Sequence, residues 1–315
     1  MSALSKTISF AFMAAFIFTG NSSSAQQTYD LDGLTDPTGF WEINIAAGGN
    51  NFLGDLGGTK GKGRPLLKDY TANTNKLLIG ASVSYNITNY AAFNAGVNFS
   101  KINDADSLID NTGDFERWRY YRNLSFRSNI FEAHADVTLY PLMWIDRKRI
   151  ELERWAPYVT TGIGMFHFRS QTFLNGEWID LQPLHLEGEG FSEYPGRKPY
   201  KTTQFYIPIN AGMKYYINNT WAVSLGVMTR LTWTDYIDDI STTYIDPQLF
   251  SKYFTPEKAA IATQLYSRSL TPWKVKPDIL KANPDNKDSY LTFYLMLSIK
   301  LHKVIPFYYP NIPHR

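Results

Sequence analysis

The sequence predicts an all-β protein, an eight-stranded antiparallel transmembrane β-barrel of the outer-membrane type with long extracellular loops. Three observations predict this fold. Apolar and polar residues alternate with a period of two in eight segments, and short and long connections separate them. The chain has 44% hydrophobic residues, yet its mean hydropathy is −0.29. That combination disfavours both a helical membrane bundle and a disordered chain.

The N-terminus has the three parts of a secretory signal peptide. Lys6 precedes an apolar run from Ile8 to Phe18, and small residues follow at Ser23 and Ala25. The apolar run is shorter than the roughly 20 residues that a membrane-spanning helix needs. We therefore expect residues 1–25 to be a cleaved signal peptide, 26–303 the barrel, and 304–315 a C-terminal tail.

Eight segments carry the alternation, in the order 40–47, 77–87, 93–100, 130–140, 157–168, 204–217, 220–235 and 290–301. The pattern is clearest in 77–87, where Leu77, Ile79 and Ala81 alternate with Leu78, Gly80 and further small residues. Successive side chains of a strand point to opposite faces, so each segment predicts a strand with one apolar face.

The connections differ in length in a way typical of outer-membrane barrels. Short turns lie around Thr88 and at Asn218-Asn219, and 141–156 is moderate, whereas 48–76, 102–129, 169–203 and 236–289 are long. Short turns face the periplasm in such barrels and long loops face outward. Within the last loop, Thr255-Pro256-Glu257 has the pattern of a helix start and predicts a short helix over 256–268.

A soluble eight-stranded barrel of the lipocalin kind would show the same alternation with its apolar face inward. Three features favour the membrane form. Gly, Ser and Asn dominate the second face, aromatic residues lie near strand ends as in interfacial girdles, and the loop lengths are asymmetric. A membrane barrel in turn predicts localisation in the bacterial outer membrane.

Six charged or titratable side chains fall on the predicted inner face: Glu132, His134, Asp136, Lys214, Arg230 and Lys300. Charges on the lipid face of such a barrel would each cost about 2–4 kcal/mol at mid-depth. We therefore expect these six residues to form a lumen charge network that fills the interior. The alternative is a catalytic or metal cluster of Glu132, His134 and Asp136 on one strand face.

Other patterns carry less chemistry. The run Asp235, Asp238, Asp239 and Asp246 offers carboxylates for calcium but lacks the central glycine of a calcium loop, so we interpret it as a strand-to-loop junction. The segment 117–127 alternates cations and aromatics, which we interpret as a rigid loop with cation–π contacts. The chain contains no cysteine, which excludes disulfides, thiolate metal sites and cysteine nucleophiles. No cofactor is expected.

Several strings resemble the PorG/SprT family, β-barrel components of the Bacteroidetes type IX secretion and gliding machinery. They are WEINIAAGGNNFLGDLGG (41–58), RNLSFRSNIFEAHADV (122–137), PYVTTGIGMFHF (157–168), LQPLHLEGEGF (181–191) and TDYIDDISTTYID (234–246). The motif residues that we single out are Arg122, Asn123, Arg127, Asp235, Asp238 and Asp239. The resemblance implies a non-enzymatic outer-membrane protein whose partners are the periplasmic ring proteins PorK and PorN.

Two other functions remain open at this point. A small outer-membrane barrel can bind or conduct a small ligand, which requires a lumen cavity. A lipid-modifying barrel enzyme would need His, Asp or Ser together at the outer rim. If the chain anchors a periplasmic assembly, the candidate docking segments are 26–39, 141–156 and 302–315.

Overall fold

The computed structural model describes residues 39–56, 74–88, 90–109, 113–142, 154–218, 220–270 and 276–301. The signal peptide, the leader up to residue 38, most of 141–156 and the tail beyond 301 lie outside the described residues. The strands are β1 (Phe40–Leu53), β2 (Lys76–Thr88), β3 (Ala91–Ala105), β4 (Ser125–Leu139), β5 (Trp155–Leu174), β6 (Glu177–Asp180), β7 (Thr203–Tyr216), β8 (Trp221–Thr232) and β9 (Ser289–Leu301).

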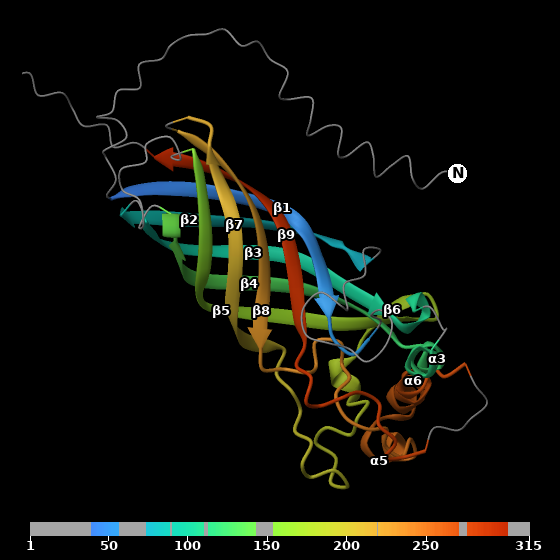
Figure 1. The fold of residues 1–315 in the computed structure, drawn as a ribbon. Coiled ribbons are helices and arrows are strands. Elements are labelled where there is room, and N and C mark those ends of the chain that lie inside the picture. Colours follow the sequence, from blue (N-terminus) through green and yellow to red (C-terminus); the bar gives the residue numbers. More distant parts are fainter. Residues whose placement is uncertain are drawn as a thin grey trace, which may run out of the picture. The chain divides into compact units, whose positions relative to one another are not determined.

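Eight of these strands close into an antiparallel barrel (Figure 1). Each long strand pairs with its sequence neighbours, and β1 pairs with β9 from Trp41↔Leu301 to Leu53↔Ser289, which closes the sheet. Closure leaves no unpaired sheet edge, the condition that a β protein must meet in lipid. The predicted fold class is confirmed. This is the architecture of an outer-membrane β-barrel.

Strands β1, β3, β4 and β5 are longer at the loop end than the alternation predicts, whereas β8 ends at Thr232, before the predicted end at 235. β5 continues to Leu174 and forms a hairpin with β6, a short strand that the sequence analysis did not identify. Four residue pairs, from Gln171↔Asp180 to Leu174↔Glu177, join these two strands beyond the barrel wall. The segment 177–180 has only four residues, too few to show a period of two.

The outer surface of the barrel is apolar. The apolar side chain of Ile163 in β5 is 71% exposed, and those of Phe205 in β7 and Leu77 in β2 are each 68% exposed. The polar residues that alternate with them point inward, so the barrel is inside-out relative to a soluble one. Aromatic pairs ring the short-turn end: Trp41 lies 4.8 Å from Tyr85, and Trp155 lies 4.6 Å from Tyr215. Trp and Tyr prefer this position at a membrane interface.

Glycines inside the barrel make room for tyrosine rings. A Cβ atom at Gly164 would lie 2.2 Å from the ring of the buried Tyr206. A Cβ atom at Gly212 or Gly226 would likewise reach Tyr158, whose hydroxyl is 2.8 Å from that of Tyr294. The small residues of the inner face therefore hold space for a few large side chains that fill the lumen.

We expect Gly164→Ala to lower the free energy of unfolding by about 1–3 kcal/mol, because the added methyl group overpacks the lumen against Tyr206. Urea unfolding of the protein in phospholipid vesicles, followed by tryptophan fluorescence, measures this change. Gly196→Ala is the matched control, since no atom lies within 4 Å of a Cβ there. Equal stability of both variants would contradict a tightly filled lumen.

The long loops are folded and gather at one end of the barrel (Figure 1). Their described residues form three α-helices, α3 (Asp114–Arg122), α5 (Leu249–Tyr253) and α6 (Pro256–Tyr266), and two short 3₁₀ turns. The predicted helix 256–268 is confirmed as α6, with Thr255 as its N-terminal cap residue. The interpretation of 117–127 as a loop is wrong: this segment ends α3 and begins β4, with Asn123 in the left-handed conformation between them. None of the described helices is long and apolar enough to cross a bilayer.

Candidate functional site

The charges predicted inside the barrel centre on one buried ion pair. Arg230 Nε donates to Glu132 Oε1 at 2.9 Å and Nη2 to Glu132 Oε2 at 3.0 Å, and both side chains are fully buried. Glu132 also accepts from the Tyr290 hydroxyl and from Asn98 Nδ2, while Arg230 donates to Thr292. Every part of both charged groups therefore has a partner, as a buried pair requires.

The other predicted lumen residues are distributed differently from the expected single network. Lys214 Nζ pairs with both oxygens of Glu42, at 2.8 and 2.7 Å, nearer the short-turn end. His134 Nε2 lies 3.6 Å from Asp136 Oδ2, and Asn94 donates to the same carboxylate. Lys300 lies directly opposite Glu42 in the β1–β9 pairing but shows no ion pair with the described residues, so its place in a charge network stays a prediction. Its ammonium lies 3.9 Å from the ring centroid of Phe40 instead.

Sequence reasoning missed Glu42, the partner of Lys214. The signal was present, because Glu42 lies between Trp41 and Ile43 and so shares the inner face by alternation. Its pairing with Lys214 follows only from the closed barrel, since 172 positions separate the two residues.

A cavity of about 90 Å³ lies in the lumen beside the Glu42–Lys214 pair, with a wall of both apolar and polar side chains. Its wall includes the unpartnered polar atoms Asn44 Oδ1, His134 Nδ1 and Ser224 Oγ. Such a cavity has room and polar partners for ordered water. It is smaller than the roughly 300–1,000 Å³ of ligand pockets, so it does not favour a bound organic ligand.

The folded outer loops form what we call the loop cap: the described parts of 54–75, 106–124, 175–202 and 233–288. One apolar cluster joins the loop cap to the part of the lumen nearest the long loops, through the strand residues Phe166, Phe168, Tyr206 and Tyr290. In the loops this cluster contains Phe191, Ile237, Ile245, Phe250 and Tyr266 among others. The loop cap is therefore packed like a protein core and closes one end of the barrel.

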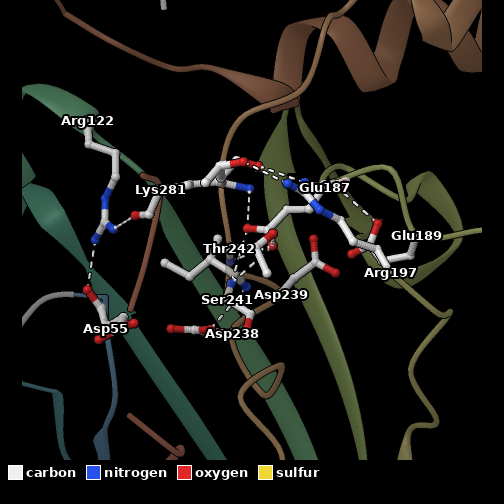
Figure 2. Close-up of polar contacts among 12 residues, drawn as sticks. Asp55, Arg122, Glu187, Glu189, Arg197, Asp238, Asp239, Ser241, Thr242 and Lys281 are labelled. Atoms are coloured by element: carbon white, nitrogen blue, oxygen red, sulfur yellow. Dashed lines mark hydrogen bonds and ion pairs between the residues drawn. The ribbon is translucent and has the colours of Figure 1, made fainter. Parts of the chain in front are cut away.

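Arg122 ties three parts of the loop cap together. It donates to Asp106 through Nε and Nη2, each at 2.8 Å. It also donates to the carbonyl oxygens of Lys281 and Asp55, at 2.6 and 2.8 Å (Figure 2). Asn123 Nδ2 donates to the Arg268 carbonyl at 3.1 Å. Arg127 lies over the Trp178 ring, 3.4 Å from its centroid, and donates to Gln171. The first three family-motif residues thus hold loops and strands together.

Glu187 is a second buried centre, at the middle of Figure 2. It accepts from the backbone N–H groups of Ser241 and Thr242 and from the Thr242 hydroxyl, at 2.7–3.2 Å. Lys281 Nζ lies 3.5 Å from Glu187 Oε1. Arg197 donates to the Glu187 carbonyl at 2.7 Å and to Thr243. These contacts fix the loop 181–191 against the segment 234–246, two of the resembling strings.

Five further carboxyl groups of the loop cap are buried without an ion-pair partner among the described residues. We call them the acidic group: Glu189, Asp235, Asp238, Asp239 and Asp288. Burial raises the pKa of Asp235 and of Glu189 to about 8 and that of Asp239 to about 7. Burial, together with the neighbouring acids, holds the pKa values of Asp238 and Asp288 well above the usual range. The last three family-motif residues belong to this group.

In the described part of the chain, no group of three or more His, Cys, Asp or Glu side chains is placed to hold a metal ion. The predicted junction 234–246 is an irregular segment that follows β8. Its acids lie close to Asp55 and Asp288, which the sequence separates from them by a long interval.

No family model and no curated protein matches the chain. Solved structures that resemble it include Neisserial surface protein A, at 8% identity and a TM-score of 0.37, covering 83% of this chain and 97% of that one. Ail of Yersinia pestis has 9% identity and a TM-score of 0.36, with 84% and 99% covered. E. coli outer membrane protein W has 14% identity and a TM-score of 0.32, with 84% and 100% covered. Nothing about the function of this chain follows from these likenesses.

Proposed function

We propose that this chain is a non-enzymatic outer-membrane component of the type IX secretion and gliding machinery, which anchors or positions the periplasmic ring of PorK and PorN. The filled and capped barrel is the observation that carries the non-conducting, anchoring part of this proposal. The secretion system itself enters through the resemblance of five strings to the PorG/SprT family.

The geometry supports an anchor better than a channel or a binding barrel. The Glu132–Arg230 pair, the aromatic cluster above it and the loop cap lie in series along the lumen. A solute would have to displace all three to pass. An apolar belt with an aromatic girdle holds such a barrel in the bilayer.

Some of the strings that resemble the PorG/SprT family also make contacts between loops in this fold. Arg122 and Asn123 fasten α3 to neighbouring loops, and 181–191 packs on 234–246 through Glu187. Three of the five resembling strings therefore contribute contacts that hold the loop cap together.

The anchor function is tested by crosslinking intact envelopes and purifying the tagged full-length chain in detergent. We expect PorK and PorN to be recovered. We expect deletion of 304–315 or shortening of 143–153 to reduce their recovery, since the first segment follows β9 and the second joins β4 to β5 where these strands reach the short-turn end. The double variant Trp118→Ala, Tyr121→Ala, which changes exposed residues of the loop cap, is the control and should recover both proteins as the wild type does. Recovery of neither ring protein from the wild type would overturn the proposal.

We also expect no ion conductance above background when the protein is inserted in a planar bilayer, because the lumen is closed by the Glu132–Arg230 pair and the loop cap. Single-channel recording over a range of voltages measures this. A known porin reconstituted in the same lipid is the positive control. Stable conductance steps from the wild type would favour the ligand-conducting alternative.

A further inference from the structure

The interior of the loop cap contains more acids than cations. Its two buried cations are already matched: Arg122 pairs with Asp106 at 2.8 Å, and Lys281 lies 3.5 Å from Glu187. The acidic group remains, and each of its five residues is at most 3% exposed. If all five were ionised, five negative charges would lie in a space from which water is largely excluded. Such uncompensated buried charge costs several kcal/mol per ion.

Two oxygens of the acidic group have no hydrogen-bond partner among the described residues. They are Oδ2 of Asp238 and Oε1 of Glu189, and both are buried, whereas Asp235 has the Ser241 side chain as a hydrogen-bond partner. An ionised carboxylate would need hydrogen-bond donors at these positions, whereas a protonated carboxyl group is neutral and can itself donate a hydrogen bond. The unpartnered oxygens therefore indicate that the site takes up protons.

The acidic group also sits where the loops meet. Asp288 Oδ2 accepts from Ile237 N at 2.8 Å, and the Tyr200 hydroxyl donates to Asp239 Oδ1. Asp238 interacts electrostatically with Asp55 of the first loop and with Asp235. Repulsion within this group would act directly on the contacts that hold 175–202 and 233–288 against each other.

We infer that protons on Glu189, Asp235, Asp238, Asp239 and Asp288 hold the loop cap closed, so that the loop cap is a pH-sensitive latch over one end of the barrel. This inference does not depend on the type IX proposal, because it uses only contacts within the loop cap. The barrel wall is held by its own ladder of strand pairs and stays closed when the latch opens.

The direction of the pH effect follows from the raised pKa values. When the loop cap is open and the carboxyl groups are exposed to water, each has a pKa of about 4. In the closed loop cap the pKa is about 7 for Asp239 and about 8 for Asp235 and Glu189. Between these limits the closed form binds more protons, so rising pH weakens it until the pH passes about 8. The charged or titratable groups that face the acidic group are Asp55, Arg122, Glu187, Tyr200, Tyr236, Lys281 and Lys287.

The test is limited proteolysis of the full chain in phospholipid vesicles between pH 6 and pH 9, with proteinase K at a fixed ratio. Cuts within 235–249 are scored by mass spectrometry, and the rate is divided by that for denatured casein at the same pH. We expect the corrected rate at pH 9 to exceed that at pH 6 by about tenfold or more, since each proton released shifts the opening equilibrium about tenfold per pH unit.

The double variant Asp235→Asn, Asp238→Asn keeps the size of both side chains but cannot ionise. We expect it to stay protected at pH 9 as the wild type is at pH 6. Asp288→Asn serves as a second variant if the double variant does not fold, and it should raise the pH at which cutting begins. Asp285→Asn changes an exposed acid of the same loop and should behave as the wild type.

Three results would overturn the latch. One is equal corrected cutting at pH 6 and pH 9 in the wild type. Another is an Asn double variant that opens at the same pH as the wild type. The third is protection at pH 9 that calcium confers and a chelator removes, which would show that a cation, not protons, balances the charge.

Discussion

Arg230→Met lowers the free energy of unfolding of the barrel by about 3–5 kcal/mol, because it leaves the fully buried Glu132 without its counter-charge. The loss is large since the Glu132 carboxylate is 0% exposed and would keep only neutral hydrogen-bond donors. Urea unfolding in phospholipid vesicles measures this loss. It is followed by tryptophan fluorescence and by the difference in gel mobility between heated and unheated samples.

Lys300→Met is the control for this change, since Lys300 also lies on the inner face by alternation but forms no ion pair with the described residues. We expect it to cost much less. The double variant Glu132→Gln, Arg230→Met should recover part of the loss, because it removes the unpaired charge. An Arg230→Met barrel as stable as Lys300→Met would show that the pair contributes little to holding the lumen closed.

Ile163→Arg places a charge on the lipid-facing surface of β5, at a position where the native side chain is 71% exposed. We expect insertion into vesicles to fall, with a loss of about 2–4 kcal/mol if the position is at mid-depth. The cost arises because the bilayer core offers the guanidinium neither water nor a counter-ion. The folded fraction recovered in vesicles, and its stability in urea, measure the effect.

Gln264→Arg provides the matched comparison, because Gln264 is an exposed residue of α6 outside the barrel wall. It should leave insertion unchanged. If Ile163→Arg folded as well as Gln264→Arg and stayed monomeric in water without detergent, the apolar surface would not be a lipid-facing one.

The sequence by itself determined the eight long strands and which face of each is apolar. The alternation in 77–87, and in 290–301 from Phe293 onward, predicted side chains whose exposure in the structure follows the same parity, whereas Leu291 at the loop end of β9 is buried. It also predicted α6, because a capping threonine, a proline and a glutamate in succession favour a helix start through local hydrogen bonds. These features depend on neighbours in the chain, so a local pattern contains them.

Only the tertiary structure decided which charges meet. Glu42 and Lys214 face each other across the closed lumen, and Arg230 reaches Glu132 from the opposite wall. Both pairings depend on strand register and on barrel closure through β1 and β9. The alternation placed Lys300 on the same face as Glu42, its partner in the β1–β9 register, but alternation contains no distance and so cannot say which cation pairs with that carboxylate.

The acidic group shows the same limit more strongly. From the sequence, Asp235, Asp238 and Asp239 form an acidic run at the end of a strand, which most often lies in water. The structure buries them beside Asp288, Glu189 and Asp55. Asp288 lies at the far end of the same loop, and Glu189 and Asp55 come from two other loops. Whether a carboxyl group is exposed and ionised or buried and protonated is set by the packing of loops distant in sequence. No local spacing records that packing.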